Sequence, residues 1–220
     1  LTISVQKPEK IPDGAWDGKT YSTAEGEIAT GYLKTILPNE PVNSSANPVL
    51  SIRKEGNTPA WGAVYEQYFQ EIDKVKGQKG VLSVEKKLFV ETNNGTNRQI
   101  RPVTPEQPLR IGDKVIVRLT IRTDREMNYV FLKDLRAGCF EPADQLSSPE
   151  SRDGIWYYRS PKDVSENFFI NRLPEGTFVL EYPVYVSRSG EYAGGISPIQ
   201  CMYAPEFVSH TAGESLRIMP

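Results

Sequence analysis

Apolar and polar residues alternate with a period of two through much of the second half of the chain. The clearest example is KVIVRLTIRT, which begins at Lys114 and places Lys, Arg and Thr mostly on one face. Alternation of this kind is typical of a strand with one buried face. Gly112 and Asp113, just before it, are a turn signal. The residues expected on the buried face are Val115, Val117, Leu119 and Ile121.

A second alternating segment, TFVLEYPVYVSR, runs from Thr177 to Arg188. Pro183 lies on its polar face and has no backbone N–H to donate, so we expect this strand to be an edge strand or to bulge there. The residues expected on the buried face are Phe178, Leu180, Tyr182, Val184 and Val186.

Further short segments of the same kind include YVFLKDL, LSVEKKLFVET, GIWYYRS, NFFINRL and SPIQCMYAP, each bounded by Gly, Pro, Asn or Asp. Short strands with turn signals at this density predict an antiparallel β-sandwich. Helix signals are poor. The best short candidates are Pro161 to Ser165 and Ser22 to Ile28.

The polar segment KVKGQKG, from Lys74 to Gly80, lies between two strand-rich blocks. We take it as the boundary between domains, which gives a smaller β-rich block at residues 1–77 and a sandwich at residues 78–220. In the first block, TGYLKTIL, PVLSIRKE and AWGAVYEQYFQEI are expected to be strands, with a loop from Asn39 to Pro48.

The composition narrows the function classes. The 220 residues carry 26 basic and 28 acidic side chains, which argues against a nucleic-acid groove or a membrane-surface patch. No apolar run approaches the ~20 residues that a membrane-spanning helix needs. We therefore expect no nucleic-acid partner and no membrane span in this chain.

His210 is the only histidine and the only candidate for a hydrolase triad. A triad needs a nucleophile and an orienting carboxylate beside the histidine. Ser209, Ser215 and Glu214 are near in sequence, but no G-x-S-x-G motif is present. The enzyme hypothesis requires His210 in a pocket with these partners, and a histidine that packs in a loop is the favoured interpretation.

Metal and phosphate motifs are absent from the sequence. One histidine and two distant cysteines cannot form a Cys/His zinc centre. Gly194 and Gly195 fit a tight strand connection or bulge better than a nucleotide loop. We predict no cofactor and no metal. The acidic residues considered as calcium ligands, which form no loop motif, are Asp124, Asp134, Asp144 and Asp153.

Cys139 and Cys201 lie far apart in the sequence. They could form one disulfide in an oxidising compartment or be two buried thiols. A reactive thiol would need a neighbouring cation, for which Arg136 is the nearest candidate in sequence.

Trp156, Tyr157 and Tyr158 are consecutive, so they cannot share one face of a strand. One face would hold Trp156 and Tyr158 and the other Tyr157. Core packing on at least one face is the favoured interpretation. A flat row of exposed aromatic residues on one sheet would instead indicate a carbohydrate-binding module.

Three parts of the chain, taken in order, resemble the C-terminal region of bacterial alpha-2-macroglobulin proteins, especially the longer forms common in Bacteroidetes. The first is PAWGAVYEQYF, from Pro59 to Phe69. The second is LSVEKKLFV followed by IGDKVIVRLTIRTDREMNYVFLKDLRAGCFEP, and the third runs from Asp153 to Phe207 and ends in QCMYAPEF. Together they cover most of residues 59–207, and it is the ordered combination that is specific.

The resemblance implies a C-terminal fragment of a large protease trap. Residues 78–220 would be the terminal macroglobulin-type, immunoglobulin-like sandwich, and residues 1–77 the last part of a CUB-like domain. The family captures proteases by a bait-and-trap mechanism, in many members through a Cys-x-Glu-Gln thioester. Neither Cys139 nor Cys201 begins that motif. The fragment would therefore be non-catalytic and would cover or position other groups.

The resemblance also implies partners and a location. The partners would be other domains of the same parent chain, a thioester-type domain among them, and the parent's target proteases. The location would be the periplasm or cell envelope, with a parent that is exported and could be lipid-anchored. An aromatic residue of this domain shields the thioester in the family, and Tyr182, Tyr185, Tyr192 and Tyr203 are the candidates. The alternative function is an envelope-associated β-sandwich that binds carbohydrate or protein.

Overall fold

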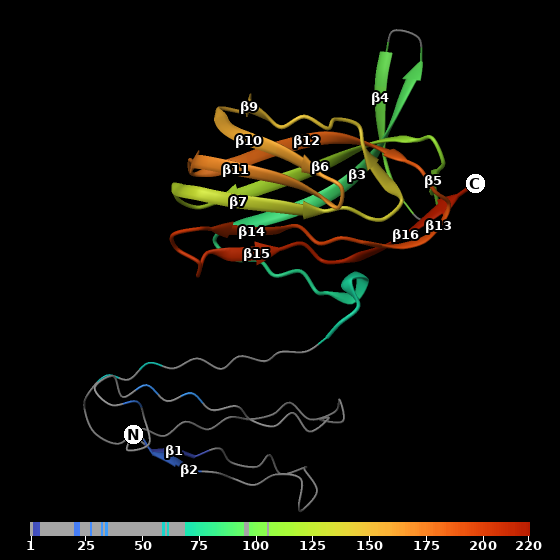
Figure 1. Ribbon diagram of the computed structural model, residues 1–220. Coiled ribbons are helices and arrows are strands. Elements are labelled where there is room, and N and C mark those ends of the chain that lie inside the picture. Colours follow the sequence, from blue (N-terminus) through green and yellow to red (C-terminus); the bar gives the residue numbers. More distant parts are fainter. Residues whose placement is uncertain are drawn as a thin grey trace, which may run out of the picture. The chain divides into compact units, whose positions relative to one another are not determined.

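The computed structural model describes residues 2–4, 20–22, 27, 32, 34, 59, 61, 69–94, 97–104 and 106–220 (Figure 1). The chain divides into two compact units, Leu1–Glu66 and Gln67–Pro220. In the first unit, β1 (Thr2–Ser4) pairs antiparallel with β2 (Thr20–Ser22). The other elements predicted before residue 69, and the CUB-like character of that block, fall almost wholly outside the described residues.

The division between the units precedes the boundary predicted after residue 77. Gln78 and His210 exchange two backbone hydrogen bonds, and the N–H of Gly213 donates to the carbonyl of Val75 at 2.9 Å. A short 3₁₀ helix, η2 (Ile72–Lys74), belongs to the same segment. Backbone pairing needs no apolar side chains, so a polar stretch that looks like a linker is part of the second unit.

The second unit is a β-sandwich, as the alternation predicted. Its six-stranded sheet has the order β15-β14-β7-β11-β10-β9, and its five-stranded sheet the order β4-β3-β6-β12-β8. A three-stranded sheet, β13-β16-β5, contains the one parallel pair among the described strands, β16 with β5. The strands are β3 (Ser83–Asn94), β4 (Asn97–Pro102), β5 (Leu109–Arg110), β6 (Lys114–Thr123), β7 (Met127–Leu135), β8 (Phe140–Pro142), β9 (Ser148–Arg152), β10 (Ile155–Lys162), β11 (Ser165–Leu173), β12 (Gly176–Val186), β13 (Gly190–Gly194), β14 (Pro198–Cys201), β15 (Val208–His210) and β16 (Glu214–Met219).

The core lies between the six- and five-stranded sheets (Figure 1). Both apolar faces predicted from the sequence are confirmed, since all the residues assigned to the inner faces of β6 and β12 are buried. The rings of Phe168 on β11 and Tyr182 on β12 meet across the two layers with centroids 6.0 Å apart. Burial of these faces is the main stabilisation of the unit.

The local predictions around the turns have mixed outcomes. Gly112 has a φ of 87°, which fits the predicted turn. β8 pairs with β12 only over Val184–Val186, so Pro183 lies just beyond that ladder. Its carbonyl accepts from the N–H of Ala143 at 3.4 Å, and its missing N–H interrupts no pairing between β8 and β12. The helix considered at Pro161 to Ser165 is wrong, because Lys162 and Ser165 pair across the β10–β11 hairpin.

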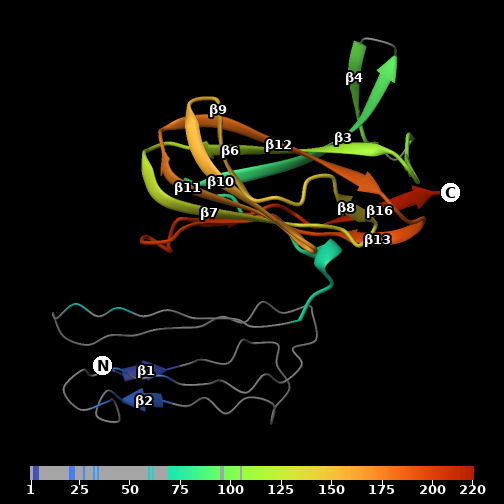
Figure 2. The ribbon, with the colours of Figure 1, turned by 45° about the horizontal axis from the view of Figure 1, so that its top comes forward.

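The β3–β4 hairpin extends beyond the sandwich (Figures 1 and 2). β3 pairs with β6 as far as Glu91, and its last residues pair only with β4. In the part of the chain that the structure describes, no helix has the length and apolar character of a membrane span.

Candidate functional site

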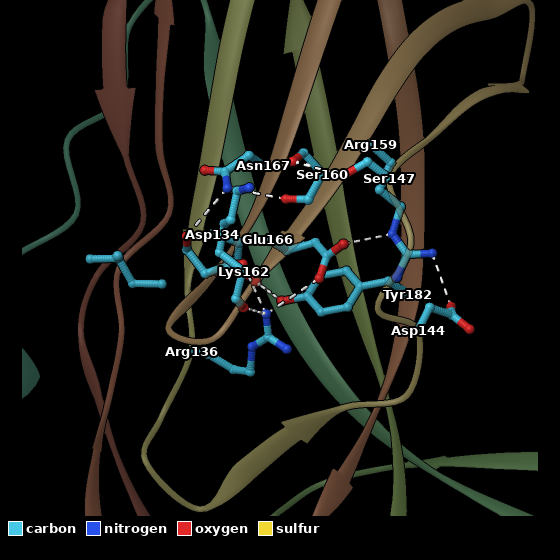
Figure 3. A network of polar contacts seen from close by, with 12 residues as sticks. Asp134, Arg136, Asp144, Ser147, Arg159, Ser160, Lys162, Glu166, Asn167 and Tyr182 are labelled. Carbon is cyan, nitrogen blue, oxygen red and sulfur yellow. Dashed lines mark hydrogen bonds and ion pairs between the residues drawn. The ribbon is translucent and has the colours of Figure 1, made fainter.

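A network of charged and polar side chains lies between the two sheets (Figure 3). At its centre is Asp134 on β7, whose side chain is fully buried. It accepts hydrogen bonds from Lys86 Nζ at 2.8 Å, from Ser197 Oγ at 2.7 Å and from the hydroxyl of Tyr182. Because Lys86 and Tyr182 come from the five-stranded sheet and Asp134 from the six-stranded sheet, this carboxylate joins the two layers.

The second buried carboxylate is Glu166 on β11. Its two oxygens accept from Arg159 Nε at 2.7 Å and from Arg136 Nη2 at 3.4 Å. Arg136 Nη2 also donates to the carbonyls of Lys162 at 2.6 Å and Ser165 at 2.8 Å, which anchors the β10–β11 turn. The network therefore fixes a hairpin as well as a pair of sheets.

Burial sets the protonation behaviour of this network. Burial, and then the charge of Asp134, raise the pKa of Tyr182 well above its ordinary value. Burial raises the pKa of Glu166, against the opposing effect of Arg159 and Arg136. Burial alone would lower the pKa of Arg159, but its contacts with Glu166 outweigh that effect and the pKa is raised. Tyr182 thus stays neutral and donates its hydroxyl hydrogen to Asp134. This suits a residue that holds the two sheets together rather than one that transfers protons.

The opposite side of the six-stranded sheet carries exposed aromatic residues. Phe169 on β11 lies opposite Tyr158 on β10 and opposite Phe131 on β7. Trp156 is 72% exposed and Tyr203 is 80% exposed. We call this surface the outer aromatic face and define it by Tyr129, Phe131, Trp156, Tyr158, Phe169 and Tyr203.

The predicted split of the three consecutive aromatic residues is confirmed. Tyr157 is buried, and its hydroxyl donates to Glu150 Oε2 at 3.0 Å, whereas Trp156 and Tyr158 are exposed. The sequence reasoning missed Phe169 as a surface residue. Its signal was the pair Phe168-Phe169, because adjacent residues of a strand point to opposite faces.

Tyr129 has an unusual backbone for a large residue in a strand, with a φ of 56°. Left-handed conformations cost a non-glycine residue about 1–2 kcal/mol. Its carbonyl accepts a hydrogen bond from the N–H of Met202 at 2.9 Å, and its ring meets the ring of Tyr203 edge-on, with centroids 5.0 Å apart. These contacts hold the exposed ring in place.

The four tyrosines considered for a shielding role lie in different places. Tyr182 belongs to the buried network. Tyr185 is exposed on the five-stranded sheet, and Tyr192 is half-buried on β13 with its hydroxyl donating to the carbonyl of Ser189. Tyr203 belongs to the outer aromatic face. Of the four tyrosines, Tyr185 and Tyr203 are the exposed ones, at 45% and 80%.

The residues of the hydrolase hypothesis are not brought together as a triad. His210 Nδ1 lies 3.0 Å from the carbonyl oxygen of its neighbour Thr211. Ser209 is fully buried, and Ser215 Oγ donates to Asp73 Oδ2 at 3.0 Å. Alternation along β15 points Ser209 and His210 to opposite sides, so their closeness in sequence gives no catalytic contact.

The four aspartates considered as calcium ligands are also dispersed. Asp124 pairs with Arg125, Asp144 pairs with Arg159, and Asp153 accepts from a backbone N–H. Asp134 is bound within the buried network. Among the described residues no group of three or more His, Cys, Asp or Glu side chains could hold a metal ion.

The disulfide considered between Cys139 and Cys201 is not formed, since both cysteines are free and buried. Cys201 lies on β14 of the six-stranded sheet, and its Sγ donates to the carbonyl of Asn128 at 3.2 Å. Cys139 directly precedes β8 of the five-stranded sheet. Burial raises the pKa of Cys139 to about 11, which is the opposite of an activated thiol.

A shallow groove of about 390 Å³ crosses the outer face of the five-stranded sheet. Its charged residues pair with each other or with neighbours: Lys114 with Glu91, and Arg152 and Arg118 with Glu181. The groove therefore offers a ligand no unpaired charge.

Comparison with known proteins agrees with this fold. The family model described as "Bacterial Alpha-2-macroglobulin MG10 domain" matches residues 82–206, which is more than half of the chain. Salmonella alpha-2-macroglobulin reacted with methylamine is 21% identical with a TM-score of 0.52, and the match covers 66% of this chain and 10% of that one. Native alpha-2-macroglobulin from Escherichia coli, spanning domain MG7 to the C-terminus, is 17% identical with a TM-score of 0.51, and the match covers 66% and 24%.

Circularly permutated Ras protein 2 of Dictyostelium discoideum is 28% identical over 109 residues, which are 50% of this chain and 3% of that protein. This chain thus spans a small part of each relative. The low identities to solved structures establish the fold alone, whereas the family model matches residues 82–206, which hold the strands from β3 to β14. By that match, the chain belongs to the bacterial alpha-2-macroglobulin MG10 domain family.

Proposed function

We propose that the chain is the non-catalytic C-terminal region of a cell-envelope, alpha-2-macroglobulin-like protease inhibitor of the Bacteroidetes type, which works as a bait-and-trap. The observation that carries this proposal is the MG10 match over residues 82–206. The residues before the sandwich, 1–77, would be the end of a CUB-like domain.

The role of this region would be to cover or position other parts of the trap. A covering domain must move as one piece when the trap rearranges. The buried network supports this role, because Asp134 joins the two sheets and Arg136 anchors a hairpin. The outer aromatic face and Tyr185 offer exposed aromatic rings with which such a domain could exclude water from a labile group.

The partners would be a thioester-type domain of the same polypeptide and the proteases that the inhibitor captures. Escherichia coli alpha-2-macroglobulin has been solved after activation by porcine elastase, with 18% identity to this chain and a TM-score of 0.52. We extend protease capture to this protein as part of the proposal. The location would be the periplasm or cell envelope, with lipid anchoring of the parent as a further expectation.

The test uses the complete polypeptide encoded by the gene. It is incubated with elastase-like and trypsin-like proteases, and the residual activity is measured on a large protein substrate and on a small peptide substrate. A trap should block the large substrate and leave most of the activity on the small one, because a caged protease is still reached by small molecules. Equal cleavage of both substrates with and without the protein, for every protease tried, would exclude an inhibitor.

The coding sequence upstream of residue 1 gives a second test. Macroglobulin-type domains with a Cys-x-Glu-Gln segment and a lipoprotein signal would support a thioester-dependent envelope trap. Macroglobulin domains without that segment would support a non-covalent trap.

The alternative function is an envelope-associated module that binds carbohydrate or protein. The observation that favours it is the outer aromatic face, since a row of exposed aromatic residues is what such a module requires. Binding to purified cell-wall glycan that is lost in Trp156→Ala, and kept in Tyr185→Ala, would favour this alternative over the inhibitor.

A further inference from the structure

The segment that leads into the sandwich lies against its C-terminal strands. Residues 71–78, which contain η2 and are drawn in teal in Figure 1, reach β15, the edge strand of the six-stranded sheet. Gln78 pairs antiparallel with His210 of that strand, and the N–H of each donates to the carbonyl of the other, at 3.0 and 3.1 Å. We call residues 71–78 the strap. The strap thus covers part of the outer edge of β15.

Further contacts hold the strap to the residues that follow β15. The N–H of Gly213 donates to the carbonyl of Val75 at 2.9 Å, and Ser215 Oγ donates to Asp73 Oδ2 at 3.0 Å. The backbone of Gly213 lies so close to the strap that a Cβ there would overlap the carbonyl of Ile72. The closed position of the strap therefore requires a residue without a side chain at position 213.

The contacts of the strap are polar, and little apolar burial supports them. None of residues 71–80 is buried. A hollow of about 370 Å³ remains beside the strap, lined by Asp73 and by residues of β13 and β16. Leu82, in contrast, is 1% exposed and belongs to the core. Segments with few buried apolar contacts open locally at a much smaller free energy than global unfolding requires.

The strap is also able to move as one piece. Its own turn is closed by local hydrogen bonds, from the N–H of Lys74 to the carbonyl of Glu71 and from the N–H of Val75 to the carbonyl of Ile72. These bonds do not depend on β15 or on Gly213. We propose that the strap is a latch, which detaches from β15 and from Gly213 as a unit and closes again while the sandwich stays folded.

Opening would change how the sandwich is tethered to the residues before it. A fully extended chain spans about 3.3–3.6 Å per residue, so the released strap would span up to about 26–29 Å. Leu82 would keep its place in the core, and neither sheet would lose a strand. The sandwich would gain freedom of movement without unfolding, which is the role of a hinge segment in a domain rearrangement. This inference concerns the attachment of the sandwich and does not depend on the proposed function.

Hydrogen exchange on the full 220-residue chain, resolved by NMR, tests the proposal. The reporters are the amides of Gln78, His210 and Gly213, which all make hydrogen bonds across the strap contact. Their protection factors should be similar to one another and at least ~100-fold lower than those of the amides paired between β6 and β12. Low urea concentrations should speed exchange in β6 and β12 and hardly affect the reporters, because a local opening exposes little surface.

Two variants should open the strap through different contacts. Gly213→Ala should lower the protection of Gln78 and His210 by at least ~10-fold and leave β6 and β12 unchanged, because only the local contact is lost. Ser215→Ala removes one side-chain hydrogen bond and should lower the same protection by a smaller factor. The matched control is Gly80→Ala, where a Cβ would meet its nearest atoms at 3.6 and 3.7 Å and the strap should stay closed.

Three outcomes would overturn the latch. The first is protection of the reporters that equals that of β6 and β12 and has the same urea dependence, which would make the strap part of the global folding unit. The second is reporters without protection in the unchanged chain, which would mean that the strap is not closed. The third is a Gly213→Ala variant in which β6 and β12 lose as much protection as the reporters. Each outcome is independent of whether the complete polypeptide traps proteases, so failure of the latch is distinguished from failure of the proposed function.

Discussion

The hydroxyl of Tyr182 on β12 donates a hydrogen bond to the carboxylate of Asp134 on β7, and both side chains are buried between the sheets. Lys86 from β3 pairs with the same carboxylate. A buried charge is tolerated when it is paired and hydrogen-bonded, and it becomes costly when one partner is removed. This relationship makes Asp134 the residue whose replacement should cost the sandwich most.

We predict that Asp134→Asn lowers the free energy of unfolding by about 3–5 kcal/mol, because it leaves the buried ammonium group of Lys86 without a carboxylate. Urea unfolding of the complete chain measures the change. The matched control is Asp144→Asn, since Asp144 pairs with Arg159 at the surface and its side chain is 52% exposed. The control should lose at most about 1 kcal/mol. Equal losses of unfolding free energy in the two variants would contradict the role of Asp134 in joining the two sheets.

The pH dependence of stability should be visible at Glu181. Burial alone would raise the pKa of this carboxyl, but hydrogen bonds from Arg118 and Arg152 outweigh it and hold the pKa below the ordinary 4.5. Because the folded-state pKa is the lower one, the stabilisation is complete above pH 4.5 and is lost as the pH falls through the lowered value.

We therefore predict that Glu181→Gln is less stable than the wild type at pH 6 and that the difference shrinks toward pH 3. Arg152 is 42% exposed, so solvent screening limits the difference at pH 6 to about 1 kcal/mol. Urea unfolding at a series of pH values checks this. A difference that grows as the pH falls would show that the sign is wrong.

The inner faces of β6 and β12 could be predicted because alternation is a local property of the sequence. The buried network could not. Asp134 lies at an inward position of β7, but nothing near it in sequence shows that Lys86, 48 residues earlier, faces it across the sandwich. In the sequence alone, Asp134 is one of 28 acidic residues and nothing distinguishes it from the others. Its contacts with Lys86 and Tyr182 arise only when the two sheets pack together.

The outer aromatic face was predictable in part. Alternation placed Trp156 and Tyr158 on one face, but it could not decide which face was the surface. Phe169 and Phe131 are neighbours because β11 pairs with β7 in a register that places them opposite each other. The sequence of either strand alone does not determine that register. The division at Gln67 lies before the predicted boundary, and the backbone hydrogen bonds of Val75 and Gln78 that join this segment to the sandwich leave no mark in composition.

Both cysteines should be found as free thiols once the chain is unfolded. Burial raises the pKa of Cys139 to about 11, so at pH 8 it is protonated as well as inaccessible. We predict that a thiol reagent such as DTNB reacts slowly with the native chain and releases two equivalents in denaturant without reductant. Fewer than two equivalents, restored by a reductant, would establish a disulfide and contradict the structure.

Gly195 should tolerate no side chain, because a Cβ there would overlap the carbonyl of Leu135. Neither backbone can move freely, since Leu135 N–H donates to the carbonyl of Ile196 at 3.0 Å and the carbonyl of Gly195 accepts from Lys86 at 3.3 Å. We predict that Gly195→Ala costs about 2–3 kcal/mol of unfolding free energy through this overlap.

The matched control for that variant is Gly80→Ala, where a Cβ would meet its nearest atoms at 3.6 and 3.7 Å, in ordinary contact. This change should be close to neutral, because Ala also reduces the freedom of the unfolded chain. Urea unfolding of both variants measures the contrast. If Gly195→Ala were as stable as Gly80→Ala, the overlap with Leu135 would be absent. The connection between β13 and β14 would then lie farther from β7 than it does here, and the hydrogen bond from Lys86 to the carbonyl of Gly195 would not form.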